Sequence, residues 1–312
     1  MISVDVRWGV SEFRSLEQTF VIQMVVDTKP KTLSDLIRIS GLSHGTDVWL
    51  NNAQELIKSG KATISTAICT RDDIMTYLIN KWNGPSEESF TIMERVRKGL
   101  VAKGKCKDWP EFKKDMIEHG IPDWYIWSCE KIKYMFPKAH AAAYVMMAFR
   151  IAYCKVYYPL AYYAAYFSIR ASAFSYELMC QGKEKLEFYM NDYKRRSDSL
   201  SKKEQDTLKD MKIVQEMYAR GFEFLPLDIY RAKATKFQII DGKLMPPLSS
   251  IEGMGDKAAD AVEMAAADGP YLSKDDFRQR TKVSKTVIDF MADLGMFGDL
   301  PETNQLSLFD FS

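Results

Sequence analysis

A lysine, a histidine and a tyrosine with the chemistry to bind a nucleotide lie close together in the sequence, at Lys138, His140 and Tyr144. A helix that starts near Ala139 would place the histidine and the tyrosine on one face, because residues four apart are neighbours on a helix surface. Lysine and histidine side chains can neutralise phosphates, and a tyrosine ring can stack on a base or a sugar. An ordinary helix start, with a core or capping histidine and a packed tyrosine, accounts for the same residues. The residues alone favour this second interpretation.

A Gly-x-Gly step at Gly253 and Gly255 precedes the start of a predicted helix at Asp256 and Lys257. Glycines allow a tight hairpin, and the free N–H groups in the first turn of the following helix can hold a DNA phosphate. These four residues are therefore candidate DNA-binding residues of a helix-hairpin-helix. An ordinary corner between two helices with a glycine cap is the competing interpretation, since Gly-x-Gly alone is a weak signal.

Five residues near the end of the chain have the composition of a docking peptide. Chain termini are usually polar, whereas two leucines and a phenylalanine stand here after a polar stretch. Apolar residues led by a glutamine suit a groove on a partner protein. The five residues are Gln305, Leu306, Ser307, Leu308 and Phe309. A tail that folds back on its own core is the alternative, because Phe311 also follows.

The sequence gives no reason to assign a catalytic residue or a metal ligand. The acidic pairs Asp72-Asp73 and Asp275-Asp276 stand at predicted helix starts, where carboxylates act as caps and favour the helix dipole. The five cysteines are far apart and form no Cys-x-x-Cys pair, which argues against a zinc site and against a secreted disulfide framework. We therefore expect reduced, buried thiols in a cytoplasmic protein.

Helical periodicity dominates the chain, and strand signals are sparse. Thr32 and Asp35 have the spacing of a capping box at the start of a helix, which we expect to break into a loop at 41–46. Further helices are predicted over 71–81, over 89–98, from residue 110, over 122–134 and on both sides of Pro159.

The later part of the chain changes character. Residues 193–209 are dense in charged residues and serine, which is typical of a solvated linker or an exposed helix. Beyond them, Asp241-Gly242 between two short apolar runs predicts a β-hairpin. We therefore place a domain boundary near residue 221.

Composition excludes several classes of protein. The 312 residues carry a net charge of +1, so a nucleic-acid surface would have to be a local patch. The first residues lack the pattern of a signal peptide. The apolar stretch 141–169 is interrupted by Arg150, Lys155 and Pro159, which favours a buried helix pair over a membrane span.

Four motifs resemble the PolC-type DNA polymerase III alpha subunit, a C-family DNA polymerase, and occur in that family's order. They are the segments 41–49, 70–75 and 131–144, and the helix-hairpin-helix together with the terminal peptide. The resemblance extends over about 17–309, and the first sixteen residues follow the family pattern poorly.

The resemblance implies a mainly α fold with three parts. A fingers-like helical domain is expected over 1–221, of which 1–16 diverges. A small α+β duplex-binding domain, with a β-hairpin and the helix-hairpin-helix, is expected over 222–300, and a clamp-binding tail over 301–312. The implied function is that of a DNA-directed DNA polymerase, a nucleotidyltransferase of bacterial chromosomal replication that binds dNTP, primer-template DNA and the sliding clamp. A non-catalytic adaptor that binds DNA and the clamp is the alternative.

The resemblance also implies roles for individual residues. The nucleotide-binding surface is expected to contain Lys138, His140, Tyr144, Arg71, Ser43 and His44. The resemblance also makes Arg97 and Lys98 candidates for this surface, but weaker ones. Polymerases of this kind use two Mg²⁺ ions held by carboxylates. The family places those carboxylates on a palm segment outside this chain, and activity would require that partner segment.

Overall fold

The computed structural model describes residues 19–82 and 86–303, and the chain divides into two compact units at Tyr153/Cys154. Each unit has its own buried hydrophobic residues. Most of the regular elements are helices, as predicted. The predicted boundary near residue 221 differs from this division. The assignment of fingers and duplex-binding parts on either side of that boundary stays a prediction.

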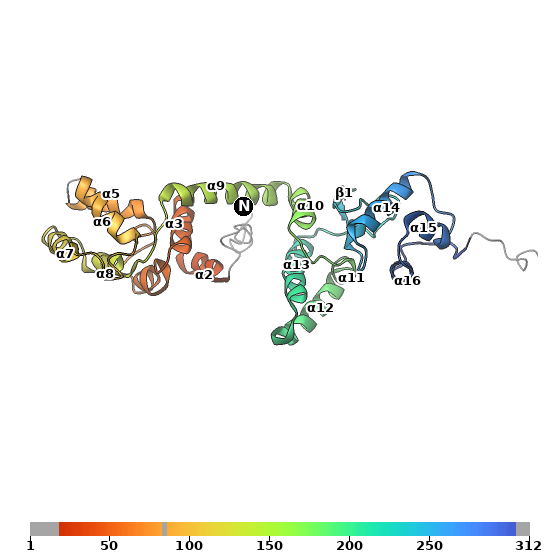
Figure 1. Cartoon of the computed structure of the whole chain (residues 1–312), viewed down its shortest axis with the longest axis horizontal. Helices are drawn as coiled ribbons and strands as arrows, with labels where there is room; N and C mark the ends of the chain where they lie inside the picture. The colour runs from red at the N-terminus through yellow and green to blue at the C-terminus, as the bar shows by residue number, and fades with distance from the viewer. Residues whose placement is uncertain (1–18, 83–85, 304–312) are drawn as a thin grey trace, which may run out of the picture. The chain divides into compact units, whose positions relative to one another are not determined.

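The first unit is helical wherever it has regular structure within the described residues (Figure 1). Its elements are α2 (Thr19–Thr28), α3 (Leu33–His44), η1 (Trp49–Ala53), α4 (Gln54–Lys58), α5 (Arg71–Trp82), α6 (Ser86–Arg97), α7 (Trp109–Glu118), α8 (Asp123–Lys131) and most of α9 (Lys138–Tyr157). Helices α5 and α6 pack side by side. Their buried residues include Ile74 and Leu78 of α5 and Ile92 and Val96 of α6. Both pairs have the spacing of four that gives a helix one apolar face.

Helix α3 corrects the prediction of a loop at 41–46. The capping box of Thr32 and Asp35 is present, but the helix continues through Gly41 and ends at His44. A Cβ on Gly41 would lie 2.6 Å from the carbonyl oxygen of Cys69. This glycine therefore allows the backbone at Cys69 to approach the helix closely. The glycine reflects this tertiary contact and does not end the helix, as the sequence had suggested.

The second unit combines helices with one small sheet. Its elements are α10 (Pro159–Ile169), α11 (Tyr176–Met179), α12 (Lys183–Arg195), η2 (Ser197–Ser199), α13 (Lys202–Ala219), β1 (Gln238–Ile240), β2 (Lys243–Met245), η3 (Leu248–Ser250), α14 (Asp256–Ala267), α15 (Lys274–Thr281) and α16 (Lys285–Asp293). One core cluster joins Phe167 of α10 and Met211 of α13 to Phe237 and Leu244 at the hairpin. This packing explains why residues 154–221 group with the later part of the chain.

The predicted β-hairpin is confirmed. Strands β1 and β2 are antiparallel, with Ile239 opposite Leu244. Asp241 and Gly242 both have a positive φ, 52° and 75°, which is the conformation that a two-residue hairpin turn of the favoured kind requires.

Two helices occupy the apolar stretch 141–169, as predicted, but α9 is not buried all round. Exposed apolar side chains on α9 include Met147, Phe149 and Tyr157. In the part of the chain that the structure describes, no helix has the length and apolar character to cross a membrane. The cysteines in the described part of the chain are free. Cys69 and Cys129 are buried as predicted, Cys106 and Cys180 are partly buried, and Cys154 is exposed, so the prediction of buried thiols was wrong at Cys154.

Candidate nucleotide-binding and DNA-binding sites

Three of the predicted nucleotide-binding side chains meet in the first unit. The rings of His140 and Tyr144 lie 4.7 Å apart, and His44 from the end of α3 lies 5.5 Å from Tyr144 and 5.9 Å from His140, measured between ring centroids. Helix α9 begins at Lys138, so the predicted shared face of the histidine and the tyrosine is confirmed. Tyr144 is 47% exposed, which leaves much of its surface free to contact a ligand.

Two further aromatic residues, Tyr134 and Phe136, extend this cluster. Phe136 stacks on His140 with 4.7 Å between centroids, and Tyr134 meets Phe136 edge to face at 5.0 Å. Sequence reasoning did not assign either ring to the site, although both fall within the 131–144 motif. Together with His44 and Tyr144 they form a continuous aromatic cluster, part of it exposed.

The loop 133–137 before α9 is held by backbone hydrogen bonds from three separate segments. Thr46 N donates to Tyr134 O at 2.9 Å, and Met135 N donates to Arg97 O at 3.2 Å. Arg71 N donates to Phe136 O at 3.2 Å. Residues that are far apart in the sequence thus fix the position of the aromatic cluster.

Two glycines allow the loop 133–137 to pack this closely. A Cβ on Gly45 would lie 2.9 Å from Tyr134 O, and one on Gly99 would lie 2.3 Å from Lys133 O. Gly99 also has a φ of +69°, which other residues rarely adopt. The segment after Lys98 is therefore shaped to receive the loop, which the sequence did not indicate.

Three cations surround Glu94 of α6. Its carboxylate accepts hydrogen bonds from Arg97 Nε and Nη2 and lies 2.9 Å from Lys98 Nζ and 3.9 Å from Arg71 Nη1. The hydrogen bonds from Arg97, reinforced by Lys98, lower the pKa of Glu94 to about 2. One carboxylate among three cations leaves a net positive patch, which is suited to phosphates.

Not every predicted residue reaches the aromatic cluster. The Ser43 hydroxyl donates to Ser40 O within α3 at 3.0 Å. The Arg71 guanidinium faces Glu94, as described above. Within the described residues, the Lys138 ammonium has no ion pair, and its backbone N–H donates to Asp72 Oδ2 at 2.6 Å. The geometry therefore joins His44, His140 and Tyr144, with Lys138 at the start of the helix that carries two of them.

The acidic pairs lie in the first turns of α5 and α15, as predicted, and three of the four carboxylates accept hydrogen bonds from backbone N–H groups at helix starts. Asp73 accepts hydrogen bonds from Thr70 N at 2.8 Å and from Cys69 N at 3.1 Å. Asp276 accepts from Leu272 N at 3.0 Å. Asp72 caps a different helix, because its partner is the first N–H of α9.

In the second unit, the Gly-x-Gly step forms the turn before α14. Gly253 has a φ of +81°, and Gly255 is the extended residue that caps α14. Between them, Met254 is buried and anchors the turn. The N–H groups of Asp256 and Lys257 precede the first hydrogen bond of the helix, which Ala258 N donates to Gly255 O. Both residues are exposed, and N–H groups in the first turn of a helix can bind an anion.

A second turn with the same order of backbone conformations precedes α16. Lys282 has a φ of +58°, Val283 is buried, and Ser284 is the extended cap, with its hydroxyl accepting from Val287 N at 3.4 Å. Lys282 and Lys285 are exposed and, within the described residues, have no ion pair. Sequence reasoning missed this turn because a lysine and a serine stand where the first turn has glycines.

The two turns are neighbours. A Cβ on Gly253 would lie 3.0 Å from Cγ2 of Val287, in the first turn of α16. Two helix N-termini with exposed lysines therefore lie next to each other in the second unit.

Comparisons with known proteins agree with these features. Residues 7–120 match the bacterial DNA polymerase III alpha subunit finger domain, and residues 221–306 match a helix-hairpin-helix motif. The chain is 50% identical over 301 residues to DNA polymerase III PolC-type of Caldanaerobacter subterraneus subsp. tengcongensis, covering 96% of the chain and 21% of that protein. The same-named proteins of Clostridium perfringens (50% identity) and Streptococcus suis (49%) are matched over 97% of the chain and 20% of their length.

The chain is similar to part of PolC-type DNA polymerase III. The resemblance predicted from the four motifs is thereby confirmed, as are the mainly α fold and the helix-hairpin-helix. The chain spans about a fifth of the length of these PolC-type relatives. The finger match starts at residue 7, inside the stretch predicted to diverge, and ends before Lys138.

The predicted clamp-binding peptide lies outside the described residues. The structure describes the chain as far as Thr303, and the peptide starts at Gln305. Just before it, the backbone at Pro301 and Glu302 accepts hydrogen bonds from the first turn of α15, through Lys274 N and Asp275 N. The role of the tail stays a prediction from its sequence.

Proposed function

We propose that this chain is the nucleotide-binding and duplex-binding part of a DNA-directed DNA polymerase of bacterial chromosomal replication. The observation that carries the proposal is the meeting of His44, His140 and Tyr144 beside Lys138. An incoming dNTP would stack its base or sugar on the exposed Tyr144 ring, and Lys138 would neutralise its phosphates. The cations around Glu94 lie on segments that hold the same loop and extend the positive surface.

Nucleotidyl transfer needs metal ions that we place outside this chain. The described residues include no group of three histidine, cysteine or acidic side chains that could hold a metal ion. The proposed source of the Mg²⁺ ligands is a palm segment, and this chain would contribute binding and orientation of the dNTP. Cytoplasmic location follows from this proposed role in chromosomal replication.

The duplex would be bound by the two turns of the helix-hairpin-helix domain. Phosphates would accept hydrogen bonds from the exposed N–H groups at the starts of α14 and α16, with Lys257, Lys282 and Lys285 adding charge. These contacts reach phosphates and not base edges, so we propose binding that does not depend on DNA sequence.

The test of the proposed function is the replacement of Tyr144 by alanine. Because stacking on an aromatic ring is worth about 1–3 kcal/mol per base, we expect Tyr144→Ala to weaken dNTP binding roughly 5- to 150-fold in a fluorescence titration. Phe149→Ala is the control, since Phe149 is an equally exposed aromatic residue of α9 outside the cluster. Equal dNTP affinity of the two variants, with duplex binding intact, would favour the non-catalytic adaptor instead.

The terminal peptide gives a separate prediction about the sliding clamp. Deleting residues 305–312 is expected to abolish or strongly weaken clamp binding, because two leucines and a phenylalanine are lost as anchors. Duplex affinity should stay nearly unchanged, since both phosphate-binding turns remain. Surface plasmon resonance with immobilised clamp measures the first quantity, and full clamp binding by the shortened chain would rule out this role.

A further inference from the structure

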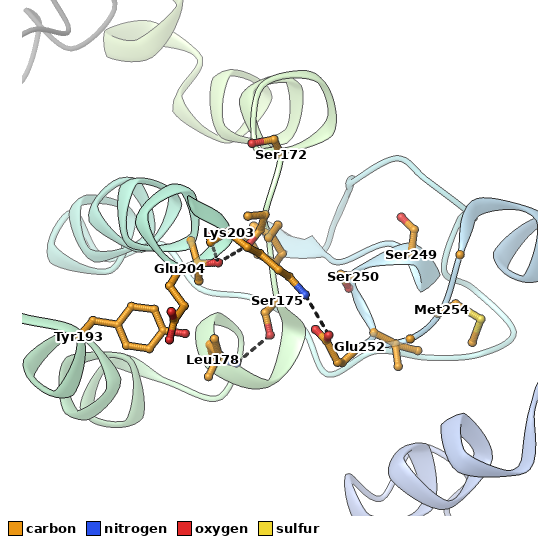
Figure 2. A pocket seen from close by; sticks show the side chains of 16 residues that line it. Ser172, Ser175, Leu178, Tyr193, Lys203, Glu204, Ser249, Ser250, Glu252 and Met254 are labelled. Atoms are coloured by element: carbon orange, nitrogen blue, oxygen red, sulfur yellow. Dashed lines mark hydrogen bonds and ion pairs between the residues drawn. The ribbon is translucent and has the colours of Figure 1, made fainter. Parts of the chain in front are cut away.

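A groove of about 650 Å³ lies beside the first phosphate-binding turn, within the second unit. Its walls are the segment 172–178, the first turns of α13 and the segment 249–255, which contains the turn itself (Figure 2). Ser172, Ser175 and Ser249 are among the polar residues that line it. The groove is thus a polar continuation of the surface around Gly253 and Gly255.

One ion pair connects α13 to the turn across this groove. Lys203 Nζ lies 3.0 Å from Glu252 Oε1, and Figure 2 shows the lysine reaching from α13 to the glutamate. The two side chains are 72% and 61% exposed. Ion pairs this exposed contribute little to stability, so a competing anion can replace the glutamate.

The remaining acidic residue of the groove is already engaged. The Glu204 carboxylate accepts hydrogen bonds from Ser201 N at 2.8 Å and from Arg196 Nη1 at 3.1 Å. These contacts lower the pKa of Glu204. Lys203 is therefore the cation that the groove itself can offer to a phosphate, and Glu252 is its competitor.

A duplex bound at the turn must place further phosphates next to it. Each DNA strand carries one negative charge per about 3.4 Å of helix axis. Glu252 directly precedes Gly253, so phosphates next to the turn would compete with its carboxylate for Lys203. The side of the turn that faces the groove needs a cation, and Lys203 is positioned to supply it.

We propose that the groove receives the DNA backbone next to the phosphate held by the turn, and that Lys203 exchanges Glu252 for a phosphate. The proposal rests on the duplex binding proposed above and adds a contact that comes from α13, outside the matched helix-hairpin-helix segment. Glu252 then acts as a resident anion that holds Lys203 in place until DNA replaces it.

The salt dependence of duplex binding tests this exchange. For the full chain with a short primer-template duplex, Lys203→Ala is expected to reduce the slope of log K against log salt by about 0.9, the loss of one phosphate contact. Glu252→Gln is expected to raise affinity roughly 1.5- to 5-fold at low salt, because Lys203 no longer has to leave a partner. Lys202→Ala is the matched control, since Lys202 is next to Lys203 on α13 but pairs with Asp206 and does not line the groove.

The outcomes separate this proposal from the proposed function. Gly255→Val tests the phosphate-binding turn, because a Cβ at Gly255 meets no neighbour within 4 Å and the added side chain would obstruct an anion there. No duplex binding by the unaltered chain would overturn both proposals. If Gly255→Val loses duplex binding while Lys203→Ala and Lys202→Ala show equal salt slopes, the groove contact is overturned. Duplex binding by the turn is then kept.

Discussion

Replacing Lys155 by methionine is expected to lower the free energy of unfolding of the second compact unit by about 3–5 kcal/mol, the cost of leaving a buried charge without its partner. Lys155 is 3% exposed and Glu216 is 5% exposed, and their charged atoms lie 2.9 Å apart. Methionine has a similar length but no charge, so the packing volume is kept. The loss would therefore report the Glu216 carboxylate without its nearest cation, since the other cation that pairs with it, Arg220, lies 3.8 Å away.

Other polar groups around Glu216 make the pair part of a network. Tyr163 donates its hydroxyl hydrogen to Glu216 at 2.8 Å, and Arg220 donates to the Tyr163 oxygen at 3.0 Å and to Lys155 O at 2.9 Å. Burial, with the charge of Glu216, raises the pKa of Tyr163 well above its ordinary value, so the hydroxyl stays a donor. These contacts fix the end of α9 to α10 and α13.

The double variant Lys155→Met with Glu216→Leu is the informative control. Removing both charges of a buried pair is often nearly neutral, so the double variant is expected to regain much of the stability that the single variant loses. Amide hydrogen exchange in α13 measures the effect within the second unit. A two-state unfolding analysis of the whole chain is not suitable, because the chain has two compact units. A single variant within about 1 kcal/mol of the unaltered chain would contradict the role given to the pair.

Local chemistry explains why some features could be predicted from the sequence. The capping box at Thr32, the hairpin turn at Asp241-Gly242 and the shared face of His140 and Tyr144 depend on residues within ten positions of one another. Periodicity and turn preferences act over that range. The predicted motifs were therefore placed on the right elements.

Contacts between distant segments explain what the sequence did not predict. His44 joins the aromatic cluster from 96 positions before His140, and Gly41 is helical because its lack of a side chain admits Cys69 O. The Lys155–Glu216 pair joins residues 61 positions apart within the second compact unit. No local pattern encodes such partners, since each depends on the packed fold.

The close approach at Gly99 leads to the second large effect. Gly99→Ala is expected to destabilise the first unit by about 2–5 kcal/mol, because the new Cβ would lie 2.3 Å from Lys133 O and would also add strain at a φ of +69°. Backbone atoms cannot rotate away as a side-chain end can. The loop 133–137 would have to shift, and with it the position of Phe136 against His140.

Gly104 supplies a closely matched control for this prediction. Its φ of +64° is almost the same, but a Cβ there would meet nothing within 4 Å. Gly104→Ala should therefore cost only the strain of the left-handed backbone, about 1–2 kcal/mol, and leave dNTP binding intact. If the close approach of Gly99 to Lys133 O positions the loop, Gly99→Ala must lose more stability than Gly104→Ala. It must also bind dNTP more weakly at temperatures where both variants are folded. Equal effects of the two substitutions on stability and on dNTP binding would mean that the loop 133–137 moves freely and that the aromatic cluster does not depend on its anchoring.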